Sequence, residues 1–231
     1  MKAQPAGQPA WPEPIRAVAH RYDKEFSGQP FDLPSEVEDM PVFKDWISGS
    51  LSARIATPFW EAVKPKKRDR CLDIGCGISF LVYPWREWDA LFYGQEISQV
   101  ACQALTSRGP QLNSKLFKGV HHAPAHRLDY DPHSFDMVIS TGVSCYYPGD
   151  YWESVLTQVK QVLKPGGWFL FDAINPEAPL AESWAILETY LGAEVHLDDL
   201  AQWPALVKAT GGRVVSHKDF ELFRLFKTKW D

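Results

Sequence analysis

Cys71-Leu-Asp-Ile-Gly-Cys-Gly-Ile-Ser-Phe80 is the stretch that decides the fold of this chain. The apolar run up to Ile74 predicts a buried strand, the Gly75-Cys76-Gly77 segment predicts a tight turn, and a helix should follow. A second apolar run, Leu91–Gln95, ends in the acid Glu96. A glycine turn after one strand and a carboxylate at the tip of the next are typical of nucleoside-binding α/β folds. Glycine lets a ligand approach the backbone, and the carboxylate accepts hydrogen bonds from ribose hydroxyls.

The composition indicates one globular domain with additions. The chain has 231 residues, of which 45% are hydrophobic, and a formal net charge of -5. We expect no nucleic-acid partner, because phosphate contacts need clustered Lys and Arg, and we interpret the basic segment Lys64–Arg70 as a solvated linker. No apolar run reaches the roughly 20 residues of a membrane helix, and no signal-peptide core is visible. We therefore expect a cytoplasmic protein without a membrane partner, whose four cysteines are reduced.

The domain organisation follows from composition and periodicity. Residues 1–14 are rich in Pro, Ala and Gln and predict a disordered tail. Residues 15–66 predict a helical extension or lid, with one helix over Ile15–Phe26. A second amphipathic helix between Val42 and Trp60, or two helices broken near Pro58, should complete it. Residues 67–231 form the α/β domain.

Strands and helices alternate in that domain, which predicts a parallel sheet covered by helices on both faces. We expect strands at Arg70–Ile74, Leu91–Glu96, Lys115–Val120, Phe135–Ser140 and Trp168–Asp172, with helices at Phe80–Glu87, Gln99–Thr106, Tyr151–Leu163 and Leu197–Thr210. The last two strand-like runs, Arg213–His217 and Glu221–Lys227, are joined by a connection too short for a parallel crossover. They should be antiparallel neighbours that close one edge of the sheet.

Four motifs together resemble the class I S-adenosylmethionine-dependent methyltransferases. Cys71–Gly77 is similar to the first motif of that family, Tyr93–Ile97 to its second-strand acid, Ser134–Ser140 to its fourth-strand motif and Val162–Phe169 to the turn into its fifth strand. The resemblance covers about Arg70 to the C-terminus. It implies a Rossmann-like, doubly wound, mostly parallel α/β sheet of seven strands with an antiparallel C-terminal strand, and S-adenosyl-L-methionine as the cofactor.

The resemblance also implies roles for individual residues at the cofactor. Asp73 would support the loop and the methionine ammonium, Glu96 would bind both ribose hydroxyls and Ile97 would pack on adenine. The backbone of Gly75, Cys76 and Gly77 would approach the cofactor, and Ser140 would line the methionine side. Each role has a purely structural alternative: a tight turn, a carboxylate that caps backbone N–H groups, or an ordinary strand end.

The chain departs from the family pattern at two positions. Ser79 stands where a third glycine is common, and Pro124 stands where the family has an acid beside the adenine amino group. Backbone groups, or Ala125 or His126, would then hold the adenine. We do not expect a metal at His121, His122 and His126, because adjacent histidines diverge on a strand and no matching carboxylate or thiolate accompanies them.

Methyl transfer from a sulfonium needs alignment more than acid–base groups, so no catalytic triad is required. We expect acceptor contacts from the segment after the fourth strand and from the N-terminal helices, with Tyr146 as the candidate catalytic contact and Tyr147 and Ser144 behind it. These tyrosines are equally consistent with packing against the helix near Tyr151. No Asn/Asp-Pro-Pro-Tyr/Phe motif follows the fourth strand, which favours a small-molecule acceptor. Removal of the chain up to Lys64 should then abolish acceptor binding and spare cofactor binding.

Two other classes of protein remain open. A nicotinamide dehydrogenase would need G-x-G-x-x-G, but Phe80 occupies the last glycine position. A non-catalytic member of the methyltransferase fold, which binds the cofactor or a protein partner, is favoured by Ser79 and Pro124. The acceptor and the oligomeric state are not determined by the sequence.

Overall fold

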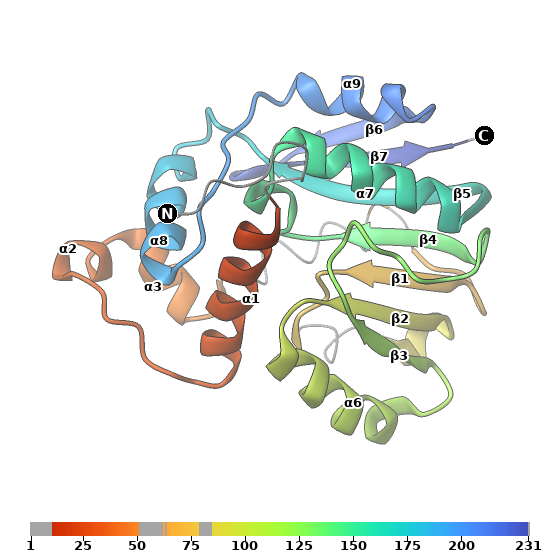
Figure 1. Ribbon diagram of the computed structural model, residues 1–231, viewed down its shortest axis with the longest axis horizontal. Helices are drawn as coiled ribbons and strands as arrows, with labels where there is room; N and C mark the ends of the chain where they lie inside the picture. Colours follow the sequence, from red (N-terminus) through yellow and green to blue (C-terminus); the bar gives the residue numbers. More distant parts are fainter. Residues whose placement is uncertain (1–10, 51–61, 63, 79–84, 231) are drawn as a thin grey trace.

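The computed structural model describes residues 11–50, 62, 64–78 and 85–230. Seven strands form one sheet in the order β3-β2-β1-β4-β5-β7-β6. β1 to β5 pair in parallel, and β7 runs antiparallel to both of its neighbours. This is the predicted doubly wound, mostly parallel architecture (Figure 1). The carboxyl ends of β1, β2 and β4 therefore meet at one edge, where ligands bind in open α/β sheets.

The central strands lie at the predicted residues. These are β1 (Arg70–Ile74), β2 (Leu91–Glu96) and β4 (Phe135–Ser140), and each is a nearly continuous buried run, as a parallel sheet covered on both faces requires. β3 (Phe117–His122) begins two residues later than predicted.

β5 (Leu163–Ile174) is much longer than predicted, because it includes the glycine turn. Leu163 pairs with Phe135 and Trp168 pairs with Met137, so residues 164–167 bulge opposite Asp136 alone. Gly166 has a φ of +79° in this bulge, a conformation that glycine adopts without strain. Both carboxylate oxygens of Asp136 accept hydrogen bonds from Lys164 Nζ at 2.7 Å. The bulge thus redirects the chain without ending the strand.

The two C-terminal strands close one edge of the sheet, as predicted, and the structure adds their order. β6 (Arg213–Asp219) and β7 (Phe223–Lys229) are antiparallel neighbours as expected. β7, which runs antiparallel to β5, lies between β5 and β6, and β6 forms the edge. β7 is mostly buried, whereas most of β6 is exposed and carries charged and polar side chains. The more apolar strand takes the inner position, and the polar strand takes the edge.

Helices connect the strands. α6 (Gln99–Asn113) and α7 (Gly149–Val162) include the predicted segments. α6 continues past its predicted end through Pro110, and Gly109 has a reason to be glycine, because a Cβ there would lie 2.7 Å from the Phe117 ring. α9 (Gln202–Ala209) lies within the predicted C-terminal helix. The short α5 (Trp85–Trp88) overlaps the end of the helix predicted at Phe80–Glu87, whose earlier residues lie outside the described part of the chain. α8 (Ala181–Leu191) was not predicted.

The N-terminal extension is helical where it is described. α1 spans Pro12–Phe26, three residues longer than predicted, with proline at its start, where the missing N–H costs nothing. The short helices α2 (Ser35–Glu38) and α3 (Pro41–Ile47) follow. Residues 12–14 of the predicted tail, which spanned residues 1–14, belong to α1, and residues 1–10 lie outside the described residues. Of the helix predicted between Val42 and Trp60, the part after residue 50 also lies outside them. Figure 1 shows α1 across the end of the sheet, between α6 and α8.

Candidate active site

A cavity of about 480 Å³ opens at the carboxyl ends of β1, β2 and β4. Its lining residues come from the first two strands and their turns, from the segments after β3 and β4, and from α1 and α7. They are Val18, Tyr22, Glu25, Phe26, Asp73, Ile74, Gly75, Cys76, Gly77, Ile78, Gln95, Glu96, Ile97, Ala123, Ala125, Thr141, Gly142, Val143, Tyr146, Tyr147 and Tyr151. Seven of the nine predicted cofactor residues are among them. His126 and Ser140 are not.

The turn after β1 is built from backbone in the left-handed region. Gly75 has a φ of +71° and Gly77 a φ of +49°, where other residues are strained. Gly75 also lacks room for a side chain, because a Cβ would lie 2.3 Å from Val143 Cγ2. The N–H groups of Gly75 and Cys76 point to the Gln95 carbonyl oxygen at 2.8 and 3.4 Å. The turn therefore stays against the tip of β2 and leaves its outer side to the cavity.

Glu96 is held by three backbone donors. Its Oε1 accepts hydrogen bonds from the N–H groups of Ile97 and Ser98, both at 2.8 Å, and its Oε2 accepts one from Gly77 N–H at 2.7 Å. Burial raises the pKa of Glu96, and these three bonds oppose the rise. A carboxylate offers roughly four lone-pair sites, so about one remains for a ligand hydroxyl. Binding both ribose hydroxyls, as the sequence predicts, would require one of these N–H groups to move.

Asp73 and Cys76 are both buried beside the turn. The side chain of Asp73 lies at the cavity wall, on the strand that precedes the glycines. Cys76 contributes its backbone to the turn, while its thiol packs toward β2. A Cβ on Gly94 would lie 2.9 Å from the Cys76 sulfur. Burial raises the pKa of the Cys76 thiol well above its usual value, so this cysteine stays a neutral packing group.

The segment after β3 is fixed without the acid that the family carries there. Gln95 Nε2 donates hydrogen bonds to the carbonyl oxygens of Pro124 and Arg127 at 2.7 and 3.0 Å. Ala125 lines the cavity, but His126 packs between the rings of Trp11 and Tyr151 behind it. Burial lowers the pKa of His126. The position of Ala125 therefore fits the predicted adenine contact, whereas that of His126 indicates a packing role.

The segment after β4 reaches the cavity through Thr141, Gly142 and Val143, not through Ser140. Ser140 is 1% exposed, and its hydroxyl has no hydrogen-bond partner among the described residues. Asp172 on β5 holds this segment, because both of its carboxylate oxygens accept hydrogen bonds from Gly142 N–H at 2.9 and 3.0 Å. Burial raises the pKa of Asp172 to about 7.

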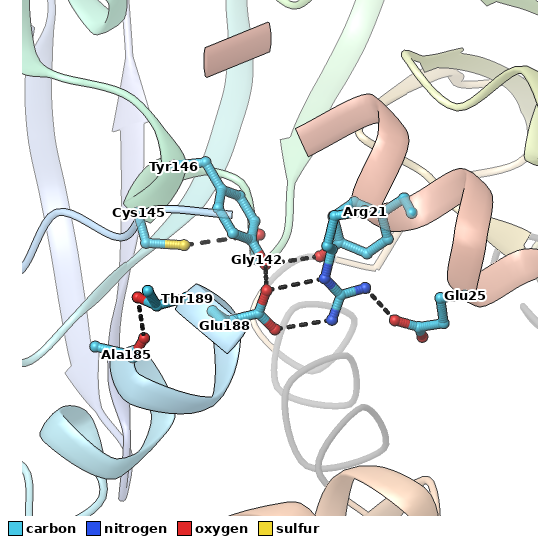
Figure 2. A network of polar contacts seen from close by, with 9 residues as sticks. Arg21, Glu25, Gly142, Cys145, Tyr146, Ala185, Glu188 and Thr189 are labelled. Carbon is cyan, nitrogen blue, oxygen red and sulfur yellow. Dashed lines mark hydrogen bonds and ion pairs between the residues drawn. The ribbon is translucent and has the colours of Figure 1, made fainter. Parts of the chain in front are cut away.

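Tyr146 belongs to a buried polar network that joins three elements. Its hydroxyl donates to Glu188 Oε2 on α8 at 2.9 Å and lies 2.9 Å from the Tyr22 hydroxyl on α1. Arg21, also on α1, donates from Nε and Nη2 to the two oxygens of Glu188 at 2.9 and 2.8 Å. Figure 2 shows the guanidinium of Arg21 between Glu188 and Glu25. Arg21 and Glu188 are 2% and 3% exposed, so this paired arrangement is desolvated.

The sequence predicted that N-terminal helices contact the acceptor, but it did not identify which residues of α1 reach the cavity. Val18, Tyr22, Glu25 and Phe26 all line it. Their spacings of four, three and one place them on one helical face, and this periodicity was a usable signal. The pairing partners of α1 on α6 and α8 carry no local signal at all.

Comparisons with known proteins agree with the four motifs. The family model described as a methyltransferase domain matches residues 72–171. A probable phthiotriol/phenolphthiotriol dimycocerosates methyltransferase 2 from Mycobacterium ulcerans is 26% identical over 198 residues, which cover 82% of this chain and 61% of that protein. A phthiotriol/phenolphthiotriol dimycocerosates methyltransferase from Mycobacterium tuberculosis is 27% identical, over 66% of this chain and 52% of that protein. The chain spans about half the length of these curated relatives.

Solved structures share the fold. A geranyl diphosphate C-methyltransferase from Streptomyces coelicolor superposes with a TM-score of 0.69 at 11% identity, over 96% of this chain and 100% of that one. A magnesium protoporphyrin IX methyltransferase from Synechocystis gives a TM-score of 0.61 at 14% identity, over 94% and 100%. The fold and the glycine-turn site define a nucleoside-binding α/β protein of the methyltransferase type. The family model and the four motifs identify residues 72–171 as a methyltransferase domain.

The cavity fits the cofactor of this family, S-adenosylmethionine. Its charged lining side chains, among the residues that the structure describes, are the carboxylates of Glu25, Asp73 and Glu96. Acids favour a ligand that carries a sulfonium and an ammonium. The turn at Gly75 and Gly77 would hold the amino-acid part, and Glu96 and Ile97 the nucleoside. Ser79, where the family often has a third glycine, lies outside the described residues.

Proposed function

We propose that this protein transfers the methyl group of S-adenosylmethionine to a small-molecule acceptor that binds beside α1. The observation that carries the proposal is the continuity of the cavity. One space is lined by the glycine turn and Glu96 and also by Tyr22, Phe26 and Tyr146. The curated relatives named as phthiotriol/phenolphthiotriol dimycocerosates methyltransferases support a small acceptor. Among the described residues no helix is long and apolar enough to cross a membrane.

When bound, the cofactor would supply an electrophilic methyl group on a sulfur that leaves as a neutral thioether. The protein would then act mainly by alignment, holding the acceptor atom about 3 Å from the methyl carbon. Gly75 and Gly77 would orient the amino-acid part. The ring faces of Tyr22, Phe26 and Tyr147 would exclude water from the acceptor.

From the hydrogen-bond network we infer that Tyr22, and not Tyr146, is the residue that contacts the acceptor. The Glu188 carboxylate only accepts hydrogen bonds, so the Tyr146 proton is committed to it. The bond between the two hydroxyls must then be donated by Tyr22. Burial raises the pKa of both tyrosines, so both remain neutral hydroxyls. The oxygen of Tyr22 keeps the capacity to accept one more bond, which suits an acceptor that carries an O–H or N–H group.

The test is a transfer assay with methyl-labelled S-adenosylmethionine and a panel of phenols, alcohols, amines and carboxylic acids. We expect turnover with an O–H or N–H acceptor, and a loss of about tenfold or more in Tyr22→Phe. A protein that binds the cofactor but methylates no member of the panel would favour the non-catalytic alternative. A protein that binds neither S-adenosylmethionine nor S-adenosylhomocysteine would contradict the proposal outright.

A further inference from the structure

Asp23 of α1 contacts the cofactor side of the site, although it does not line the cavity. Its Oδ1 accepts a hydrogen bond from Ser98 Oγ at 2.6 Å and another from Val100 N–H at 3.1 Å. Ser98 is the N-cap of α6, and its own Oγ accepts a bond from Ala101 N–H at 3.1 Å. A carboxylate at a helix N-terminus is stabilised by the unpaired N–H groups and by the helix dipole.

The same turn of α6 also holds Glu96. The N–H of Ser98 donates to Glu96 Oε1 at 2.8 Å, and the N–H of Ile97 does the same. Asp23 and Glu96 thus share the start of α6: one takes the hydroxyl of Ser98, and the other takes its N–H. A shift of Ser98 would move the donors that fix Oε1 of Glu96, and so would turn the carboxylate relative to Gly77, whose N–H holds Oε2.

The neighbouring contacts of α1 hold Asp23 in place. It lies on α1 between Arg21, which pairs with Glu188 on α8, and Glu25, which lines the cavity. α1 therefore has one polar attachment to α6 and another to α8, on the two sides of the cavity. The family match begins only at residue 72, so this helix lies outside the segment that carries the methyltransferase motifs.

We propose that Asp23 is a positioning residue of the cofactor site. By holding Ser98 and the first turn of α6, it keeps the carboxylate of Glu96 in place for a ribose hydroxyl and Ile97 in place beside the nucleoside. This inference rests on the proposed function, because it assumes that Glu96 receives the ribose. It makes α1 a part of the cofactor site as well as of the acceptor site. Removal of the chain up to Lys64 should then weaken cofactor binding too, contrary to the expectation from the sequence.

The experiment measures binding of S-adenosylhomocysteine and of its 2′,3′-dideoxy analogue to the full-length protein by calorimetry. We expect Asp23→Ala to weaken binding of S-adenosylhomocysteine by about tenfold. The same variant should bind the dideoxy analogue within about twofold of the wild type, because this analogue has no ribose hydroxyl that could donate a hydrogen bond to Glu96. Asp23→Asn keeps an oxygen acceptor at the same place and should lose less than about threefold.

Glu13→Ala is the matched control, because it removes an exposed acid from the same helix and should leave both affinities unchanged. Ser98→Ala provides a second route if Asp23→Ala does not fold: it removes the hydroxyl that Asp23 binds and keeps the N–H that Glu96 binds. The same difference between the two ligands should appear.

Three results would overturn the inference while leaving the proposed function intact. The first is wild-type affinity of Asp23→Ala for S-adenosylhomocysteine. The second is an equal loss of affinity of this variant for both ligands, which would indicate a general structural role. The third is an Asp23→Asn variant that binds S-adenosylhomocysteine as weakly as the alanine variant does. Failure of the wild type to bind S-adenosylhomocysteine would instead contradict the proposed function. The two failures are therefore distinguishable.

Discussion

The two ends of the cavity are held in different ways. At the cofactor end, backbone groups do most of the positioning: three N–H groups fix Glu96, and the glycine turn is bonded to the Gln95 carbonyl. At the acceptor end, side chains from three distant elements meet in the network of Arg21, Glu188 and the two tyrosines. Backbone positioning follows from the fold and tolerates sequence change, whereas a side-chain network depends on every member. We expect substitutions at the acceptor end to have the larger effects on stability.

The largest effect should come from Glu188→Gln. The substitution removes the carboxylate charge that pairs with Arg21 in a desolvated site and leaves the guanidinium with Glu25 as its remaining ion-pair partner. Breaking a buried pair costs up to about 3–5 kcal/mol. Urea unfolding followed by circular dichroism measures the loss. Asp219→Asn is the control, because it breaks the exposed Arg224–Asp219 pair, which should contribute about 1 kcal/mol or less.

The same variant sharpens the comparison between the two ends. Where Glu188→Gln remains folded, its affinity for S-adenosylhomocysteine should stay within about threefold of the wild type. A much larger loss would mean that the acceptor-end network also sets the cofactor site, and the division into two ends would be wrong.

We expect an intermediate effect on the free energy of unfolding from the titration of Asp172. Burial raises its folded-state pKa to about 7, from the ordinary value of 3.8 for an aspartate. The folded state therefore holds the proton more tightly than the unfolded state, and the stability that this adds at low pH is lost as pH rises through 7. The stability of the wild type relative to Asp172→Asn should fall by about 2.5 kcal/mol between pH 5 and pH 8. A difference that is flat across this range would show that Asp172 does not titrate there.

The smallest effect compares two glycines, one on each side of the cavity. Gly75 and Gly142 have similar φ values, +71° and +68°, but only Gly75 has a neighbour in the way of a Cβ. Gly142→Ala should cost about 1 kcal/mol for its backbone alone. Gly75→Ala should cost about 1–2 kcal/mol more and should also weaken S-adenosylhomocysteine binding. Equal costs in thermal unfolding would mean that Val143 moves aside freely.

The sequence was sufficient for the parts of the fold that carry local patterns. β1, β2 and β4 were located to the residue, because each is a short apolar run with a turn or an acid at its end. Gly75 and Glu96 were found from the spacing between motifs. The order of the last two strands in the sheet was not predicted. Their short connection makes them neighbours, but it does not determine which of them pairs with β5. That choice depends on the greater burial of β7.

The acceptor side of the candidate site was predicted only in part, whereas the cofactor side was predicted residue by residue. The bonds from Arg21 to Glu188 and from Asp23 to Ser98 join residues 167 and 75 positions apart, and no local pattern reports such pairs. α8 was missed along with them, although it supplies Glu188. Tyr146 was recognised from its place after β4, but its partners decide what its hydroxyl can do, and those partners come from the unpredicted contacts.

The distance in sequence between Arg21 and Glu188 has a consequence for synthesis on the ribosome. Chains grow at about 5–20 residues per second, so roughly ten to thirty seconds pass between the appearance of the guanidinium and that of its carboxylate. During that interval the aromatic face of α1 and the guanidinium of Arg21 cannot be buried, because the elements against which they pack are not all present. α1 is therefore expected to dock late, because its partner Glu188 is made only after β1 to β5.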